Sequence, residues 1–69
     1  MNKPVAAYRR NDSVALVFAD GVANEFDTTK GIEAEMSIVC FDGREQGWTE
    51  IPVEDGVSAA IDCGFDMED

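Results

Sequence analysis

The stretch VALVFADGVANEF, residues 14–26, decides the fold, because two apolar runs flank an Asp-Gly pair. Asp-Gly between alternating apolar residues is a strong β-hairpin signal, since glycine adopts positive φ without steric cost. A three-residue loop pairs Val14 with Phe26, apolar against apolar. A two-residue loop would instead place Leu16 opposite Glu25. Because a slip of one residue turns every side chain to the other face, the sequence predicts the three-residue loop.

This predicted loop comprises residues 19–21, with Gly21 in the left-handed region. The register that follows gathers apolar side chains on one face of the hairpin. They are Val14, Leu16, Phe18, Val22 and Phe26. One face of the sheet is therefore expected to be buried.

Further strands are predicted on both sides of this hairpin. Asn11-Asp12 is a turn signal that separates a strand within residues 5–10 from the hairpin. In residues 32–40 apolar and polar side chains alternate, which predicts a second strand. A third strand is expected near residues 48–53, where Pro52 argues for an edge or bulge position. In the segment 32–40 the alternation directs one set of side chains inward: Ile32, Ala34, Met36, Ile38 and Cys40.

Residues 57–65 fit two structures. Their odd positions are all apolar, which favours a half-buried strand that pairs through a loop over 54–56, with Val53 opposite Val57. The alternative is a helix with Asp55 as N-cap and Gly64 just past its end. That helix would turn three side chains inward: Val57, Ala60 and Ile61. Periodicity favours the strand, and the helix stays open as the alternative.

The predicted fold class is all-β, with five or six antiparallel strands in a meander that forms a small barrel or a curled sheet. In the alternative the C-terminal strand is a short helix. The chain of 69 residues is expected to be one acidic mini-domain, 1–69, with a thin core. Its hydrophobic content of 45% is too high for a disordered segment, although the net charge is −10.

The charge is distributed unevenly along the chain. Residues 1–30 carry as many basic as acidic side chains, whereas Arg44 is the only basic residue in 31–69. The whole net charge of −10 therefore belongs to the second half. Such self-repulsion opposes a compact state, so solubility or a function is expected to maintain it.

The residue inventory argues against catalysis, metal binding and direct nucleic-acid binding. The chain has no histidine, and its hydroxyl groups have no evident activating base. No stretch fits a calcium loop, and Cys40 and Cys63 are too few for a zinc site or a redox motif, so free thiols on apolar-face positions are expected. Arg9 and Arg10 beside Tyr8 form the only basic patch, too small for phosphate binding. We therefore predict a non-enzymatic protein without cofactor or metal.

An acidic face is the sharpest functional prediction. If the segments 32–40, 48–53 and 57–65 are strands, their outward carboxylates form a ladder with a spacing of about 6.6 Å along each strand. Trp48 and Glu50 are two residues apart, so in a strand both side chains point outward. Trp48 would then anchor a protein contact, unless it covers the core at the start of its strand. The predicted partner-binding residues are Glu33, Glu35, Trp48, Glu50, Glu54, Asp55, Asp62 and Asp66.

In length, charge, lack of histidine and acid-dense 31–69 segment, the chain resembles the small acidic phage-encoded inhibitors, which include anti-CRISPR proteins and other DNA mimics. The resemblance implies an inhibitor that occupies the basic nucleic-acid-binding surface of a host nuclease or defence complex. That inhibitor would act in the host bacterial cytoplasm. Those proteins share no fold or motif, so the resemblance assigns no role to any residue.

The alternative function is a structural or accessory subunit of a larger assembly. It would bind through exposed apolar residues, for which Val39, Phe41 and Trp48 are candidates. A calcium-binding module is a third reading. The sequence predicts neither a membrane span nor a signal peptide, and it leaves the oligomeric state open, with a homodimer as one alternative.

Overall fold

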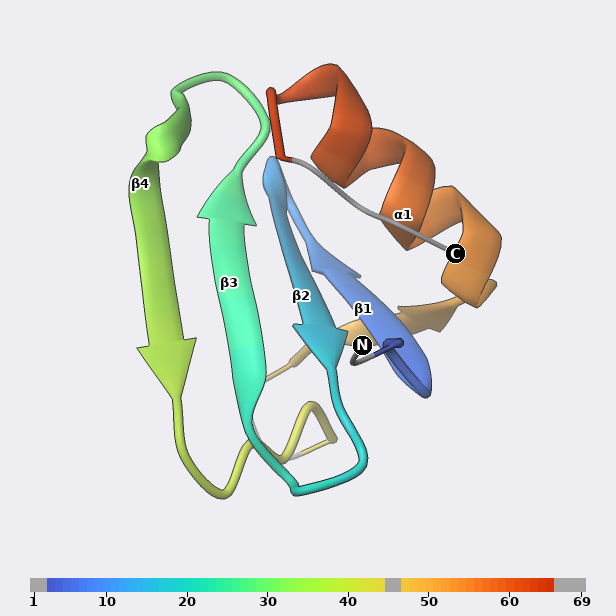
Figure 1. Cartoon of the computed structure of the whole chain (residues 1–69). Coiled ribbons are helices and arrows are strands. Elements are labelled where there is room, and N and C mark those ends of the chain that lie inside the picture. Colours follow the sequence, from blue (N-terminus) through green and yellow to red (C-terminus); the bar gives the residue numbers. More distant parts are fainter. Residues whose placement is uncertain (1–2, 45–46, 66–69) are drawn as a thin grey trace.

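One antiparallel sheet and one helix make up the domain (Figure 1). The computed structural model describes residues 3–44 and 47–65, except the side chains of 32–34. The elements are β1 (Ala6–Arg10), β2 (Ser13–Val17), β3 (Ala23–Asp27), β4 (Gly31–Ile38), β5 (Thr49–Ile51) and α1 (Val53–Asp62). The strand order β4-β3-β2-β1-β5 places β4 and β5 at opposite edges, so the sheet is open. The predicted antiparallel fold class is confirmed, as a curled sheet rather than a closed barrel.

The β2–β3 hairpin has the predicted register. Val14 pairs with Phe26, and the N–H of Phe18 donates to the carbonyl of Val22 at 2.9 Å. Gly21 has φ +87°, in the left-handed region that the three-residue loop requires. Burying apolar side chains on one face therefore fixed the register, as the alternation indicated.

The turn between β1 and β2 is also confirmed. Arg10 pairs with Ser13, which leaves Asn11 and Asp12 as a two-residue loop. Asn11 has φ +55°, a conformation that asparagine tolerates better than most residues. The same register aligns Tyr8 with Ala15, so the two side chains lie on one face of the sheet.

Residues 57–65 do not form the favoured strand, because α1 spans Val53–Asp62. The predicted hairpin loop over residues 54–56 is therefore wrong as well. The helix alternative is confirmed at its C-terminal end. Gly64 has φ +103° and donates to the carbonyl of Ile61, while Phe65 donates to the carbonyl of Ala60, as in a Schellman motif. The predicted N-cap is wrong: the helix begins directly after Pro52, with no side-chain cap.

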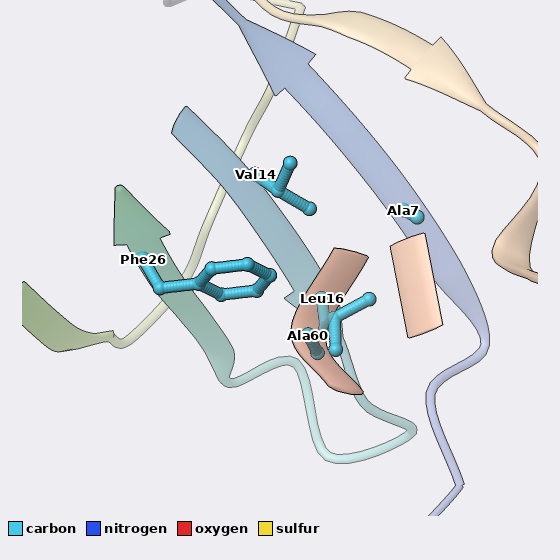
Figure 2. Close-up of a cluster of buried hydrophobic side chains, with 5 residues drawn as sticks. All are labelled: Ala7, Val14, Leu16, Phe26 and Ala60. Atoms are coloured by element: carbon cyan, nitrogen blue, oxygen red, sulfur yellow. The ribbon is translucent and has the colours of Figure 1, made fainter. Parts of the chain in front are cut away.

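The core lies between α1 and one face of the sheet, where α1 packs across β1 and β2 (Figure 1). Five buried side chains from both layers form it: Ala7, Val14, Leu16, Phe26 and Ala60 (Figure 2). Gly56 lets the helix approach closely, since a Cβ there would lie 2.6 Å from the Cβ of Ala7. Small residues on α1 thus fit the helix to the sheet. The predicted inward position of Ile61 is wrong, because 51% of this side chain is exposed.

The opposite face of the sheet is partly covered by residues 39–44 and 47–48, which lie between β4 and β5 in the chain. The Phe41 ring lies 5.3 Å from the ring of Tyr8 and 5.5 Å from that of Trp48. Gly43 is buried, and a Cβ there would lie 2.9 Å from the Tyr8 ring. The sheet therefore has a second, aromatic cluster on the side away from α1.

The predicted strand over 32–40 is shorter than expected, since β4 ends at Ile38. Cys40 lies past this end with φ +60° and is exposed, so its predicted apolar-face position is wrong. Met36 is 58% exposed although it was predicted to point inward. The physical reason is the position of β4 at the sheet edge, beyond both α1 and the aromatic cluster. Cys63, in contrast, is half-buried against the core as predicted.

Candidate functional site

The predicted carboxylate ladder is divided between different parts of the fold. Glu35 on β4 and Glu50 on β5 are both exposed, but their strands form opposite edges of the sheet. The third predicted strand is a helix, so Asp62 does not continue a sheet surface. The side chain of Glu33, and Asp66 as a whole, lie outside the described part of the chain.

The strand pairing assigns Glu50, but not Glu35, to a face of the sheet. Ser37 pairs with Asn24, which pairs with the core residue Leu16, so Ser37 lies on the side of the sheet that α1 covers. Glu50 pairs with Tyr8 and lies on the opposite side. Glu35 precedes Met36, where the pairing of β4 with β3 shifts its register, so the regular alternation of faces ends before Glu35.

Helix α1 brings the remaining predicted carboxylates together on its outer side. Glu54, Asp55 and Asp62 are exposed, whereas Gly56 and Ala60 on the other side are buried. Asp55 and Asp62 are about 10 Å apart along the helix axis and lie nearly above one another, because seven residues make almost two turns. The solvent face of α1 is thus an acidic surface, which we call the α1 acidic face (Glu54, Asp55 and Asp62).

The electrostatics of α1 differ between its two ends. The carboxylates of Glu54 and Asp55 lie in the first turn, where the helix dipole favours negative charge. Asp62 lies in the last turn, which has no basic residue, and there the dipole disfavours a carboxylate. Helix stability therefore does not account for Asp62.

Trp48 is buried, with 7% of its surface exposed, so it packs in the aromatic cluster on the side away from α1 and is not the exposed anchor that the acidic-face prediction needs. It shares a face with Glu50, as predicted, but Phe41 packs on that face. The guanidinium carbon of Arg10 lies 4.4 Å from the centre of the Trp48 ring, a cation–π contact. Among the described residues the indole Nε1 has no hydrogen-bond partner, an arrangement that costs stability.

Two exposed apolar residues lie at the same edge of the sheet, of which sequence reasoning missed one. Val39, just past the end of β4, is 73% exposed and was among the exposed apolar candidates, whereas Met36 is 58% exposed but was predicted to point inward. Only the position of β4 at the edge distinguishes Met36 from a core residue. An alternating apolar pattern carries no signal for strand order, so the sequence alone could not identify Met36 as exposed.

The turn between β3 and β4 contains a carboxyl group with a lowered pKa, that of Asp27. Asp27 accepts hydrogen bonds from the hydroxyl and, at 2.8 Å, from the N–H of Thr29. These bonds, the hydroxyl first, together with the nearby charge of Lys30, hold the pKa of Asp27 below its ordinary value of 3.8. Because folding lowers this pKa, ionised Asp27 stabilises the folded state above pH 3.8, and the contribution is lost as the pH falls through the lowered value.

Thr29→Val should therefore raise the pKa of Asp27 toward 3.8, because valine keeps the shape of threonine without its hydroxyl. An NMR titration of the Asp27 carboxyl carbon measures this change. Thr28→Val is the matched control, since the Thr28 hydroxyl donates to the carbonyl of Asp12 and not to Asp27. An unchanged Asp27 titration in Thr29→Val would show that the hydroxyl does not stabilise the carboxylate.

The described residues contain no group of three or more His, Cys, Asp or Glu side chains that could hold a metal ion. Over the same part of the chain, no helix is long and apolar enough to span a membrane. Both cysteines are free thiols, and the Sγ of Cys63 faces the carbonyl of Thr28 at 3.8 Å. Cys63 thus has a packing position at the end of α1.

Comparison with known proteins adds no relative. No family model, no curated protein and no solved structure matches this chain. The features available for a functional inference are therefore its own: the α1 acidic face, the exposed carboxylates of β4 and β5, and the apolar residues beside β4.

Proposed function

We propose that this domain is a small non-catalytic inhibitor that binds a basic nucleic-acid-binding surface of another protein and excludes the nucleic acid from it. One observation carries the proposal: every described acidic residue between positions 35 and 62 is exposed, and Arg44 is the only basic residue in the second half of the chain. The exposed acids are Glu35, Asp42, Glu50, Glu54, Asp55 and Asp62. A host nuclease or defence complex in the bacterial cytoplasm is the target class.

Electrostatic complementarity gives the mechanism. A surface of this charge attracts a groove lined by lysine and arginine and accelerates association with it. Carboxylates on the domain would then occupy the positions of the phosphates of the nucleic acid. The α1 acidic face is the best candidate for the contact, because Asp62 lies at a helix end where its carboxylate opposes the dipole.

The test is an affinity capture from nuclease-treated bacterial lysate at low and high salt. A nucleic-acid-binding protein retained at low salt and released at high salt is the expected result, since salt screens contacts between charges. The captured protein is then bound to a labelled DNA duplex, which the domain should displace. A partner held equally at both salt concentrations would contradict the proposal.

Asp62→Lys should weaken binding to the captured partner about fivefold, the equivalent of roughly 1 kcal/mol for one charge at an interface. It should at the same time raise the free energy of unfolding by about 0.3–1 kcal/mol, because lysine suits a helix C-terminus. Opposite effects on binding and stability would show that Asp62 serves the contact.

The matched control is Asp12→Lys, which makes the same charge change at an exposed position of the β1–β2 turn. Binding is measured by calorimetry and unfolding by urea titration. Equal weakening by both variants would show that the net charge matters and the position does not, which would remove the α1 acidic face as the contact.

An accessory subunit is the second candidate function. The exposed Met36 and Val39 favour it, because apolar side chains at a sheet edge suit a permanent protein contact. Such a contact would respond weakly to salt, so the same capture experiment separates the two functions. Of the apolar candidates named from the sequence, Trp48 is buried and Phe41 is half-buried, which leaves Val39.

A further inference from the structure

The two edges of the sheet differ in how open they are to another strand. At one edge, β5 has only 3 residues and is followed directly by Pro52. At the other edge, β4 has 8 residues without lysine or proline, and β3 is its only hydrogen-bonded neighbour among the described strands. Short length and proline are devices that protect an edge from pairing. β5 has both and β4 has neither, although β4 has a register shift against β3, so that its regularly paired part is Met36, Ser37 and Ile38.

The described side chains near the β4 edge are apolar and acidic. Met36 pairs with Glu25, which pairs with Ala15 and so lies on the side away from α1. Met36 is therefore an exposed apolar group on that side, and Val39, just past the strand, is exposed as well. Glu35, directly before Met36, is an exposed carboxylate. The edge thus offers unpaired backbone groups beside an apolar and an acidic side chain.

Charge decides which strand fits this edge. A second copy of the chain would bring another net charge of −10 and another Glu35 to the contact, and like charges at close range oppose pairing. An extended segment with basic residues would be attracted to this edge by the same negative charges. We propose that β4 is a docking edge for an extended basic segment of the partner, which adds to the sheet as a sixth strand.

In this arrangement the bound segment alternates between basic and apolar residues. Its basic side chains lie beside Glu35, and its apolar side chains cover Met36. Backbone hydrogen bonds to β4 supply affinity, and the alternate side chains supply specificity, as in other strand-addition complexes. The inference rests on the proposed function only in taking the partner to be basic.

The experiment uses a synthetic peptide, blocked at both ends and as long as β4 (8 residues), in which lysine alternates with valine. The control peptide has the same sequence with N-methylated backbone amides, so it keeps every charge but cannot donate hydrogen bonds to β4. NMR titration of the isotope-labelled domain should show shifts along β4 with the first peptide. The control should bind at least about tenfold more weakly, because several backbone hydrogen bonds are lost.

Two variants of the domain locate the contact. Glu35→Lys should weaken binding of the unmodified peptide about fivefold, whereas Glu50→Lys makes the same charge change at the protected edge and should have little effect. Circular dichroism confirms that both variants are folded. Equal weakening by the two variants, or equal binding of the two peptides, would overturn the docking edge in favour of plain charge attraction.

Two further outcomes separate this inference from others. Shifts in β4 that depend on the concentration of the domain alone would identify a second copy as the occupant and overturn the proposal. Peptide binding at β4 together with failure of the salt-sensitive capture would support the docking edge and overturn the proposed inhibitor function. Capture without peptide binding would overturn the docking edge and leave the inhibitor function standing.

Discussion

Phe26→Ala should leave the domain largely unfolded at 25 °C. Phe26 is the largest fully buried side chain, and its ring lies 5.0 Å from that of Phe65, just past the end of α1. Truncating a buried phenylalanine to alanine removes about 3–5 kcal/mol from the free energy of unfolding. Domains of this size rarely have more than about 3–5 kcal/mol in total. Loss of the cooperative transition in urea, followed by circular dichroism, is the expected observation.

Met36→Ala is the control for this variant. Met36 also carries a large apolar side chain on the sheet, but 58% of it is exposed. Its truncation should change the free energy of unfolding by no more than about 0.5 kcal/mol, as is usual at the surface. A Phe26→Ala variant that unfolds at the same urea concentration as Met36→Ala would show that α1 does not depend on the Phe26 ring.

Gly56→Ala should destabilise the domain by about 1–3 kcal/mol, although alanine is the better helix former by roughly 1 kcal/mol. The added Cβ would lie 2.6 Å from the Cβ of Ala7 and 2.8 Å from a methyl carbon of Leu16. The Cβ of Ala7 moves only with its backbone, so α1 would have to shift away from the sheet. The sign of the change, measured by urea titration, decides between helix propensity and close packing.

Ser58→Ala is the matched control, because Ser58 is exposed on the same helix and alanine there should be neutral or slightly stabilising. A second variant identifies the contact. Adding Ala7→Gly to Gly56→Ala removes the methyl group that clashes, so the double variant should lose less stability than the sum of the single changes. Additive losses would mean that the two positions do not meet.

The β2–β3 hairpin could be predicted from the sequence because its determinants are local. Only one loop length places Val14 opposite Phe26, and Gly21 accepts the backbone conformation that this loop needs. The register therefore depends on residues that are close in the chain. The same holds for the β1–β2 turn at Asn11.

The helix could not be chosen over the strand for residues 57–65 because the deciding contacts are distant in sequence. The odd positions alternate like a strand, and Gly56 and Ala60 are spaced like one face of a helix. An open sheet with Val14, Leu16 and Phe26 on one face needs a second layer to cover them. A helix with small residues on its inner side provides this layer, whereas another strand would have left the face exposed to water.

The exposure of the acidic residues could be predicted, but their arrangement could not. Carboxylates without counter-charges remain in water, and Glu35, Glu50 and Asp62 do so. Which of them are neighbours depends on strand order, which places β4 and β5 at opposite edges. The same order exposes Met36 at the sheet edge, and alternation within one strand contains no information about strand order.

The order of the elements along the chain has a consequence for synthesis on the ribosome. The strands β1 to β3 are complete by residue 27, but the side of the core that covers Leu16 and Phe26 comes from α1 and Phe65. A nascent chain therefore holds a charge-balanced sheet with one bare apolar face until its acidic second half emerges. During that interval the chain can aggregate or recruit a chaperone, and the carboxylates that characterise the finished surface are not yet present to keep it in solution.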